Sequence, residues 1–246
     1  MNENIIILKK EFKRIKNMGW IKSVRKDKGG IGITFEKMIG VQENSLEIPD
    51  FGDIEIKTKR AYSKSYTGLF NCTPTGPHYH EVERLKEKFG YPDKNLKKFK
   101  VLNASVSTTE KQKVGINFYF QLSIDKINQK IFLHVFDKFD NLVEKCVYWD
   151  FDILEEKIYR KLSKIAFVKA IVKKINKEEY FKYYDLKIYK LKSFDKFIEL
   201  IERGIIRITF KIGIYKSGDK IGKIYDHGTS FNIRGCDLEK LYDLIE

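Results

Sequence analysis

The sequence holds few of the residues that mark a disulfide-rich or zinc-clustered protein. Its 246 residues include 3 cysteines, 4 prolines and 2 tryptophans. Cys72, Cys146 and Cys236 are odd in number, far apart and free of CxxC spacing, which argues against a disulfide framework and a structural zinc site. His78 and His80 lie near Cys72 in the chain. Three soft ligands without a fourth do not make the usual zinc site.

Long apolar runs are also missing. No segment is long and apolar enough to cross a membrane. The stretch Met1–Ile5 lacks the basic start and small-residue cleavage site of a signal peptide. We therefore expect a cytoplasmic protein with no membrane partner. The length fits one large domain or two intimate lobes with a sizeable core.

Acidic residues are outnumbered by basic ones. The chain has 48 lysines and arginines against 34 aspartates and glutamates, a formal net charge of +14. Such a charge favours a polyanionic partner, with nucleic acid first, because neutralised phosphates release their counterions. A lysine-rich composition can also reflect only a genome rich in A and T, so charge supports this partner without proving it.

One stretch carries recognisable chemistry, Pro49-Asp50-Phe51-Gly52-Asp53-Ile54-Glu55-Ile56-Lys57-Thr58. From Asp53 the polarity alternates, which predicts a strand with Glu55 and Lys57 on one face and two isoleucines in a core. Asp50 lies five residues before Glu55. Two carboxylates beside one lysine suit metal-assisted phosphodiester hydrolysis: the acids hold Mg²⁺, and the lysine orients water or stabilises charge. This is the pattern of the PD-(D/E)xK nucleases.

The acid-x-Lys triplet alone carries little information in so lysine-rich a chain. It also occurs at Glu11/Lys13, Glu155/Lys157 and Asp185/Lys187. Only the triplet at Glu55 lies on an alternating apolar strand with Pro-Asp upstream. The competing interpretation is a solvated, charged strand face.

Periodicity predicts a mixture of helices and strands. Helices are expected over 5–15, 81–89, 152–163, 194–203 and 237–245, with a short one capped by Thr34 and ending near Gly40. Strands are expected over 116–124 and 130–136, joined to the sheet of the central strand, and over 166–175, 180–191 and 205–215. Basic and aromatic residues after the central strand suit contacts along a DNA backbone; they are Lys59, Arg60, Lys64, Tyr62 and Tyr66.

The residues now show a family resemblance. The runs 30–36 and 49–58 closely resemble the MvaI/BcnI type II restriction endonucleases. The resemblance continues through 135–138, 147–152, 211–218 and 226–231, nearly the whole chain in order, whereas little matches between about 73 and 113. It implies an α/β architecture, an α+β mixed sheet of the PD-(D/E)xK restriction-endonuclease-like type, related to the mismatch-repair nickase MutH.

The resemblance also implies an activity: Mg²⁺-dependent cleavage of double-stranded DNA at a short, C/G-flanked, pseudo-palindromic site. A CCWGG-like site is favoured, with CCSGG- or CCGG-like sites as alternatives. The enzyme is expected to act as a monomer that nicks the strands in turn, with a cognate DNA methyltransferase as genetic but not physical partner. We expect one two-lobed domain over 1–246 around a DNA cleft. Approximately 1–150 carries catalysis, and approximately 151–246 carries the recognition cluster.

Position by position, the resemblance implies that Asp50 and Glu55 are metal ligands, Lys57 the catalytic lysine and Glu36 a helix-borne accessory acid. The DNA-binding residues predicted from the basic stretch and the matching C-terminal block are Lys59, Arg60, Lys64, Arg207, Tyr215, Lys223, Asp226, His227 and Thr229. Asp226 either accepts a bond from a cytosine amino group or orients His227.

Two alternatives stay open. One is a MutH-like repair nickase that depends on a partner protein, and the other is a basic DNA-binding protein without catalysis. The intact Asp50, Glu55 and Lys57 set argues against the second. A neighbouring cytosine methyltransferase gene would favour the restriction enzyme over the nickase.

Overall fold

The computed structural model describes residues 2–27, 29–41 and 48–246. Its chain divides into two compact units, each assembled from separate segments. Unit 1 comprises 1–67, 157–193 and 238–246, and unit 2 comprises 68–156 and 194–237. These units do not follow the expected boundary near residue 150, because unit 1 includes the strands after that point and the end of the chain.

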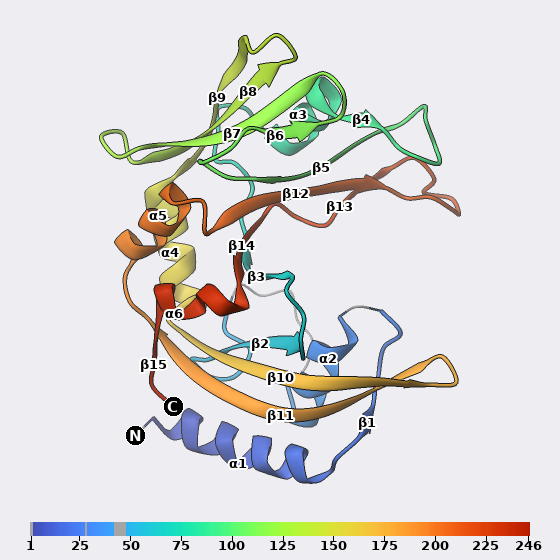
Figure 1. Cartoon of the computed structure of the whole chain (residues 1–246), viewed down its shortest axis with the longest axis vertical. Helices are drawn as coiled ribbons and strands as arrows, with labels where there is room; N and C mark the ends of the chain where they lie inside the picture. Colours follow the sequence, from blue (N-terminus) through green and yellow to red (C-terminus); the bar gives the residue numbers. More distant parts are fainter. Residues whose placement is uncertain (1, 28, 42–47) are drawn as a thin grey trace. The chain divides into compact units, whose positions relative to one another are not determined.

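Unit 1 is built on one five-stranded mixed sheet with the order β1-β11-β10-β2, to which β15 adds by pairing with β11. β10 and β2 run parallel, whereas β11 is antiparallel to β10, β1 and β15. Helix α1 lies along β11 (Figure 1). The bounds are α1 Glu3–Asn17, β1 Ile21–Lys22, α2 Gly30–Met38, β2 Glu55–Arg60, β10 Lys164–Ile175, β11 Glu178–Leu191, α6 Leu238–Leu241 and β15 Tyr242–Leu244.

The core of unit 1 lies between this sheet and helices α1 and α2. The four apolar positions of α1 recur at steps of three and four residues, so they form one buried stripe. They pack with alternate residues of the three long strands; the cluster includes Ile5, Leu8, Phe12, Ile15, Phe35, Ile54, Ile56, Ala166, Val168, Ala170, Phe181 and Tyr183. This face of the sheet is covered by the helices, so only the opposite face is free of this core cluster.

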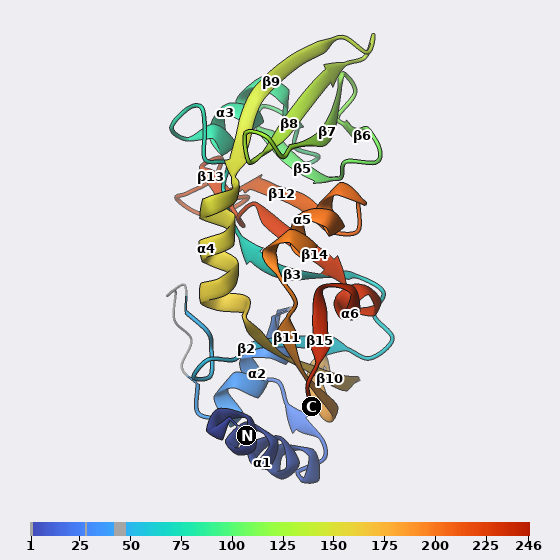
Figure 2. The ribbon, with the colours of Figure 1, turned by 90° about the vertical axis from the view of Figure 1, so that its left-hand side faces the viewer.

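Unit 2 contains two further sheets. One has the order β3-β14-β12-β5-β4 with β13 paired to β12, and the other has the order β6-β7-β8-β9. Helix α4, Phe151–Leu162, connects β9 to β10 along the chain (Figure 2). The remaining bounds are β3 Tyr66–Asn71, α3 Glu81–Phe89, β4 Tyr91–Pro92, β5 Lys100–Val106, β6 Gln112–Val114, β7 Phe118–Asp125, β8 Lys130–Asp137, β9 Leu142–Asp150, α5 Phe194–Glu202, β12 Arg207–Ile214, β13 Ile224–Asp226, β14 Ser230–Arg234 and the 3-10 turn Gly235–Asp237.

Several sequence-based expectations are confirmed and three are wrong. β7 and β8 are strands as expected. They pair with each other and with β6 and β9, and they do not join the sheet that contains β2. Alternation identifies a strand without identifying its partner. Thr34 lies inside α2 and accepts a hydrogen bond from the Val24 amide at 3.2 Å, so it caps nothing. The final helix stops at Leu241 because the next residues pair with β11.

None of the described helices has the length and apolar character needed to span a membrane.

Candidate active site

The candidate active site is built by a tight turn that folds residue 50 back onto β2. Phe51 and Ile54 exchange backbone hydrogen bonds at 2.9 Å in an antiparallel bridge. The next pair in that register places Asp50 opposite Glu55. Asp50 Oδ2 also accepts a hydrogen bond from the Ile56 amide at 2.9 Å. The five-residue spacing seen in the sequence therefore places the two acidic residues opposite each other, near enough for the Asp50 charge to raise the pKa of Glu55.

Gly52 makes this turn possible. Its φ is +59°, in the left-handed region that side chains rarely adopt. A Cβ at this position would lie 2.4 Å from Asn4 Nδ2, so the space is also closed. The same asparagine donates to Asp53 Oδ1 at 2.9 Å, and Asn2 donates to Asp53 Oδ2 at 2.9 Å. The start of α1 thus locks the turn that presents Asp50.

Glu55 is a buried carboxylate with one free oxygen. Glu55 is only 3% exposed, although it lies on the face of β2 opposite the core residues Ile54 and Ile56. Oε1 accepts from Lys57 Nζ at 2.8 Å and lies 3.6 Å from Lys161 Nζ. Oε2 is buried and has no hydrogen-bond partner within the described part of the chain. An unsatisfied buried carboxylate oxygen is costly unless something binds it.

The electrostatics explain what would bind there. Burial raises the pKa of Glu55 above its ordinary value, the Lys57 ammonium opposes that rise, and the Asp50 carboxylate adds to it. A divalent cation on Asp50 and Glu55 would satisfy the free oxygen and relieve the repulsion between the two acids. Mg²⁺ is commonly held by only one or two carboxylates together with substrate phosphate. The residues present therefore fit a magnesium site.

Two residues near Glu55 escaped sequence reasoning. Lys161 comes from the end of α4, and Tyr242 opens β15. Tyr242 is fully buried with an unpartnered hydroxyl, and burial together with the Glu55 charge raises its pKa. Neither lies in a motif: Lys161 comes from a helix about a hundred residues after Glu55, and Tyr242 is placed by the pairing of β15 with β11. No local sequence signal identifies them.

Glu36 lies on the other side of β2 from the catalytic pair. A Cβ on Gly32 would be 3.4 Å from Glu36 Oε1 and 3.3 Å from Thr58 Oγ1. Thr58 is one residue from Lys57, so its side chain points to the opposite face of the strand. Burial and the charge of Glu36 raise the pKa of the core residue Tyr183. The accessory-acid role of Glu36 stays a prediction.

The basic residues after the catalytic strand have different environments. Lys59 is buried, and its ammonium donates to Ser65 Oγ at 2.9 Å and to Thr67 Oγ1 at 3.2 Å. It also donates to the Ser65 and Tyr66 carbonyls. The ammonium of Lys59 is thus occupied in holding the chain that follows β2, and the structure gives its predicted DNA contact no support. Arg60 donates to both oxygens of Glu179, at 3.0 and 2.7 Å, whereas Lys64 is exposed.

In unit 2, an aromatic cluster joins three residues at one end of β12. The Tyr215 and Tyr225 rings are 4.7 Å apart, and the Tyr225 and His227 rings 4.2 Å apart. These three residues line a hollow together with Asp93 and Asn103. His227 is exposed, as are Lys223 and Asp226. The structure therefore presents most of the predicted recognition cluster on the surface of this unit.

The other predicted recognition residues behave differently. Asp226 Oδ1 accepts from the Gly228 amide at 2.7 Å, so one carboxylate oxygen closes the turn. Thr229 is fully buried and presents no hydroxyl to solvent, so the structure gives its predicted DNA contact no support. Arg207 stands at the start of β12, away from the cluster at its end, and pairs with Glu110 at 2.8 Å.

Comparison with known proteins identifies the family. The family model of the MvaI/BcnI restriction endonuclease family matches residues 9–242. Among solved structures, the complex of restriction endonuclease MvaI with cognate DNA substrate is 35% identical over 99% of this chain and 98% of that one, with a TM-score of 0.92. MvaI in the absence of DNA is 34% identical over 99% and 97%, with a TM-score of 0.63.

No curated protein matches the chain. The family model nevertheless covers almost all of it, and the MvaI likeness extends over essentially the full length of both proteins. The mixed α+β fold agrees with that of a restriction endonuclease. The chain therefore belongs to the MvaI/BcnI restriction endonuclease family and is a site-specific deoxyribonuclease.

Proposed function

We propose that the protein is a type II restriction endonuclease that hydrolyses double-stranded DNA with Mg²⁺ held by Asp50 and Glu55. The observation that carries this proposal is the unpartnered, buried Oε2 of Glu55 beside Asp50, with Lys57 on the other oxygen. Bound Mg²⁺ would supply Lewis-acid polarisation of the phosphate and a more acidic water. The protein's own groups then account for the remaining chemistry.

Lys57 is the group that meets the developing charge. Its side chain is 17% exposed and its ammonium donates to Glu55 Oε1 at 2.8 Å, so the group is held in place on a side chain that solvent still reaches. In hydrolysis, a water molecule gives up one proton as its oxygen bonds to phosphorus, the bond from phosphorus to the leaving sugar oxygen breaks, and that oxygen takes up one proton. A fixed cation stabilises the extra negative charge on the phosphate during this exchange.

The proposed substrate is a short, C/G-flanked, pseudo-palindromic site, with CCWGG-like sequences favoured. A CCSGG- or CCGG-like site is the alternative. The family resemblance and the 35% identity to an enzyme solved with cognate DNA support this choice. The proposal includes a cytoplasmic monomer and a host methyltransferase as genetic partner. Purified protein should cut plasmid into discrete fragments in Mg²⁺ without any other protein and fail in EDTA; a need for a partner protein would favour the nickase.

Cleavage is expected to proceed through a nicked intermediate. A monomer with one Asp50, Glu55 and Lys57 set hydrolyses one phosphodiester per engagement, so it must reorient to reach the second strand. Supercoiled plasmid with one site should give open circles before linear product. Rapid-quench time courses on agarose gels, with light scattering for mass, make the measurement. Linear product without a nicked lag, from a dimer, would contradict the proposal.

His227 is proposed to read a base edge. It is exposed, and its ring packs edge-on against Tyr225 at 4.2 Å, which fixes its direction. Imidazole can donate to guanine N7 or O6 in the major groove. His227→Ala should weaken binding to the cognate duplex by about 1–3 kcal/mol and leave scrambled duplex nearly unchanged. Binding is measured in Ca²⁺ at two salt concentrations.

Lys223→Ala is the matched control for His227→Ala. Lys223 is exposed near His227 but carries only a point charge, so its loss should weaken cognate and scrambled binding alike and reduce the salt dependence. An equal loss on both duplexes for His227→Ala, or no loss on either, would assign His227 to the scaffold of the turn.

A further inference from the structure

The catalytic face of the unit 1 sheet continues beyond the active site. In the parallel register, Glu55 pairs with Ile165 and Lys57 with Phe167, so odd-numbered residues of β10 share the face of the catalytic pair. That alternation carries Ile171 and Lys173 onto the same face. The even-numbered residues Ala166, Val168 and Ala170 lie in the core on the opposite face.

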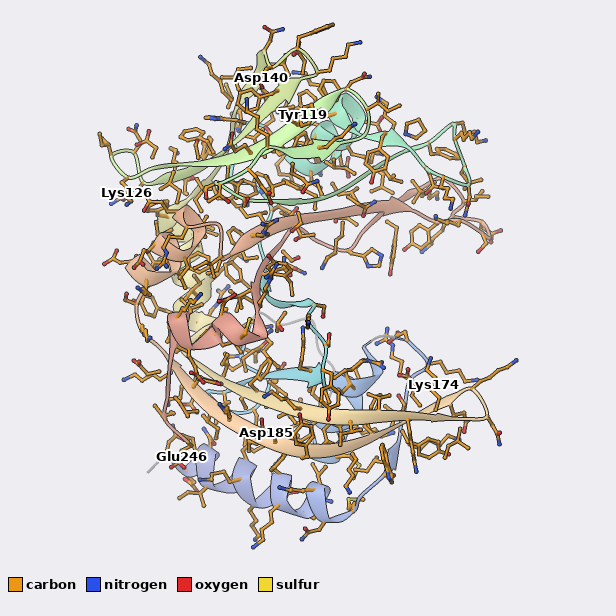
Figure 3. The ribbon with its side chains drawn as sticks, viewed as in Figure 1. Tyr119, Lys126, Asp140, Lys174, Asp185 and Glu246 are labelled. Atoms are coloured by element: carbon orange, nitrogen blue, oxygen red, sulfur yellow. The ribbon has the colours of Figure 1, made fainter. Side chains whose placement is uncertain are left out.

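A bulge between Lys169 and Ala170 shifts the pairing of β10 with β11, but the residues of β10 keep the same alternation between the two faces of the sheet. Beyond it, Ala170 pairs with Tyr183, and both are core residues. The neighbouring pairs Ile171 with Lys182 and Lys173 with Tyr180 therefore belong to the catalytic face. This face therefore continues to the tip of the β10–β11 hairpin, near which Figure 3 labels Lys174.

Basic and aromatic residues gather on this end of the face. Lys22 pairs with Tyr180 in the β1–β11 register, which places Lys22 there too. Lys173 Nζ lies 4.3 Å from the centre of the Trp20 ring and 5.8 Å from that of Tyr180. We call these residues the hairpin stripe: Trp20, Lys22, Lys173, Tyr180 and Lys182.

The hairpin stripe is open and carries uncompensated charge. Trp20 is 38% exposed, and Lys22 and Lys182 are exposed. Neither Lys173 nor Lys182 forms an ion pair with any residue that the structure describes. Lys22 pairs with Glu178 at 2.7 Å, but an exposed pair of this kind contributes little and exchanges readily for another anion.

The distance from Glu55 to the hairpin stripe corresponds to several base pairs of duplex DNA. Eight residues of β10 separate Ile165, beside Glu55, from Lys173. At about 3.3 Å per residue they span roughly 26 Å. Duplex DNA advances about 3.4 Å for each phosphate of one strand, so this span corresponds to roughly eight base pairs. A duplex cleaved at Glu55 and following this face would bring backbone phosphates to the stripe outside a short recognition site.

We propose that the hairpin stripe binds the phosphate backbone of duplex DNA flanking the recognised site, roughly six to eight base pairs from the cleaved bond. This inference rests on the proposed function, because it takes the phosphate at Glu55 as its reference. Lysines supply phosphate contacts without sequence information. The Lys173 ammonium lies over the Trp20 ring and within cation–π range of Tyr180, which favours one position for it.

The test compares cognate duplexes with flanks of about 2 and about 14 base pairs on each side, lengths that stop short of and pass the stripe. Wild-type enzyme should bind the long duplex in Ca²⁺ roughly tenfold more tightly, as expected for two phosphate contacts. The double variant Lys173→Ala, Lys182→Ala should bind both duplexes equally. The slope of log K against log salt on the long duplex should fall by about two.

The matched control is Lys10→Ala, Lys13→Ala, which removes the same charge from exposed positions of α1 in the same unit. It should keep the flank advantage. Loss of that advantage in the control, its retention in the stripe variant, or equal wild-type binding to both duplexes would each overturn the inference. If wild-type enzyme cuts no DNA site-specifically, the proposed function fails instead. Thermal melting of both variants checks that the fold is unchanged.

Discussion

Replacing Lys57 by alanine should reduce DNA cleavage by at least about 10²–10³-fold, the scale of losing one preorganised charge-stabilising donor. The ammonium acts on charge that develops in the reaction and contributes little to holding the duplex. Cognate binding in Ca²⁺ should therefore persist. Single-turnover cleavage and duplex binding are measured side by side, with Lys10→Ala as a control for loss of one exposed positive charge.

A pH series makes this experiment sharper. The Lys57 ammonium opposes the rise in the pKa of Glu55 that burial causes, so its removal should raise that pKa further. If protonation of Glu55 were the whole defect, activity of Lys57→Ala would return as the pH is raised. We expect no such recovery, because the charge on the attacked phosphate would still lack its partner. Full cleavage by the variant in Mg²⁺ would remove Lys57 from the site.

Asp50→Asn should fail for a different reason. The amide oxygen can still accept from the Ile56 amide, now 2.9 Å from Asp50 Oδ2, so the turn should survive. A neutral ligand binds a hard cation more weakly than a carboxylate does. Even outer-shell changes cost about 10–100-fold in metal affinity, so a direct ligand should cost at least as much.

The metal dependence of Asp50→Asn is the readout. The half-saturating Mg²⁺ concentration should rise, and Mn²⁺ or high Mg²⁺ should restore part of the rate. Because the Asp50 charge raises the pKa of Glu55, its removal lowers that pKa, and protonation of Glu55 does not explain the loss. Asp50→Leu, which has no ligand oxygen, serves as the reference for complete loss. Normal cutting by Asp50→Asn at unchanged Mg²⁺ would show that Asp50 is not a ligand.

The sequence predicted the catalytic strand because its signal is local. Alternation from Asp53 to Thr58 required Glu55 and Lys57 to share a face, and the 2.8 Å ion pair agrees. The adjacency of Asp50 depended on a glycine with positive φ and on a bridge between Phe51 and Ile54. The spacing indicated that the two acids converge but did not show how.

Features that depend on distant segments were not predictable in the same way. The partner of β2 is β10, more than a hundred residues later in the chain, and no periodicity identifies it. Lys161 lies at the end of the helix that leads into β10, and Tyr242 is placed by the pairing of β15 with β11. Lys59 fits the sequence pattern of a lysine that contacts DNA, yet its ammonium already donates hydrogen bonds to Ser65 and Thr67. Charge pattern predicts a basic surface but not which ammonium groups are already bound.

The most direct test of the central claim is to sequence the fragment ends after digesting a phage genome with purified protein. Wild-type enzyme in Mg²⁺ should leave one short, C/G-flanked sequence at every end, whereas EDTA-treated enzyme and Lys57→Ala should leave no specific ends. Ends without a common sequence, or the same ends from Lys57→Ala as from wild type, would contradict a site-specific nuclease centred on Asp50, Glu55 and Lys57.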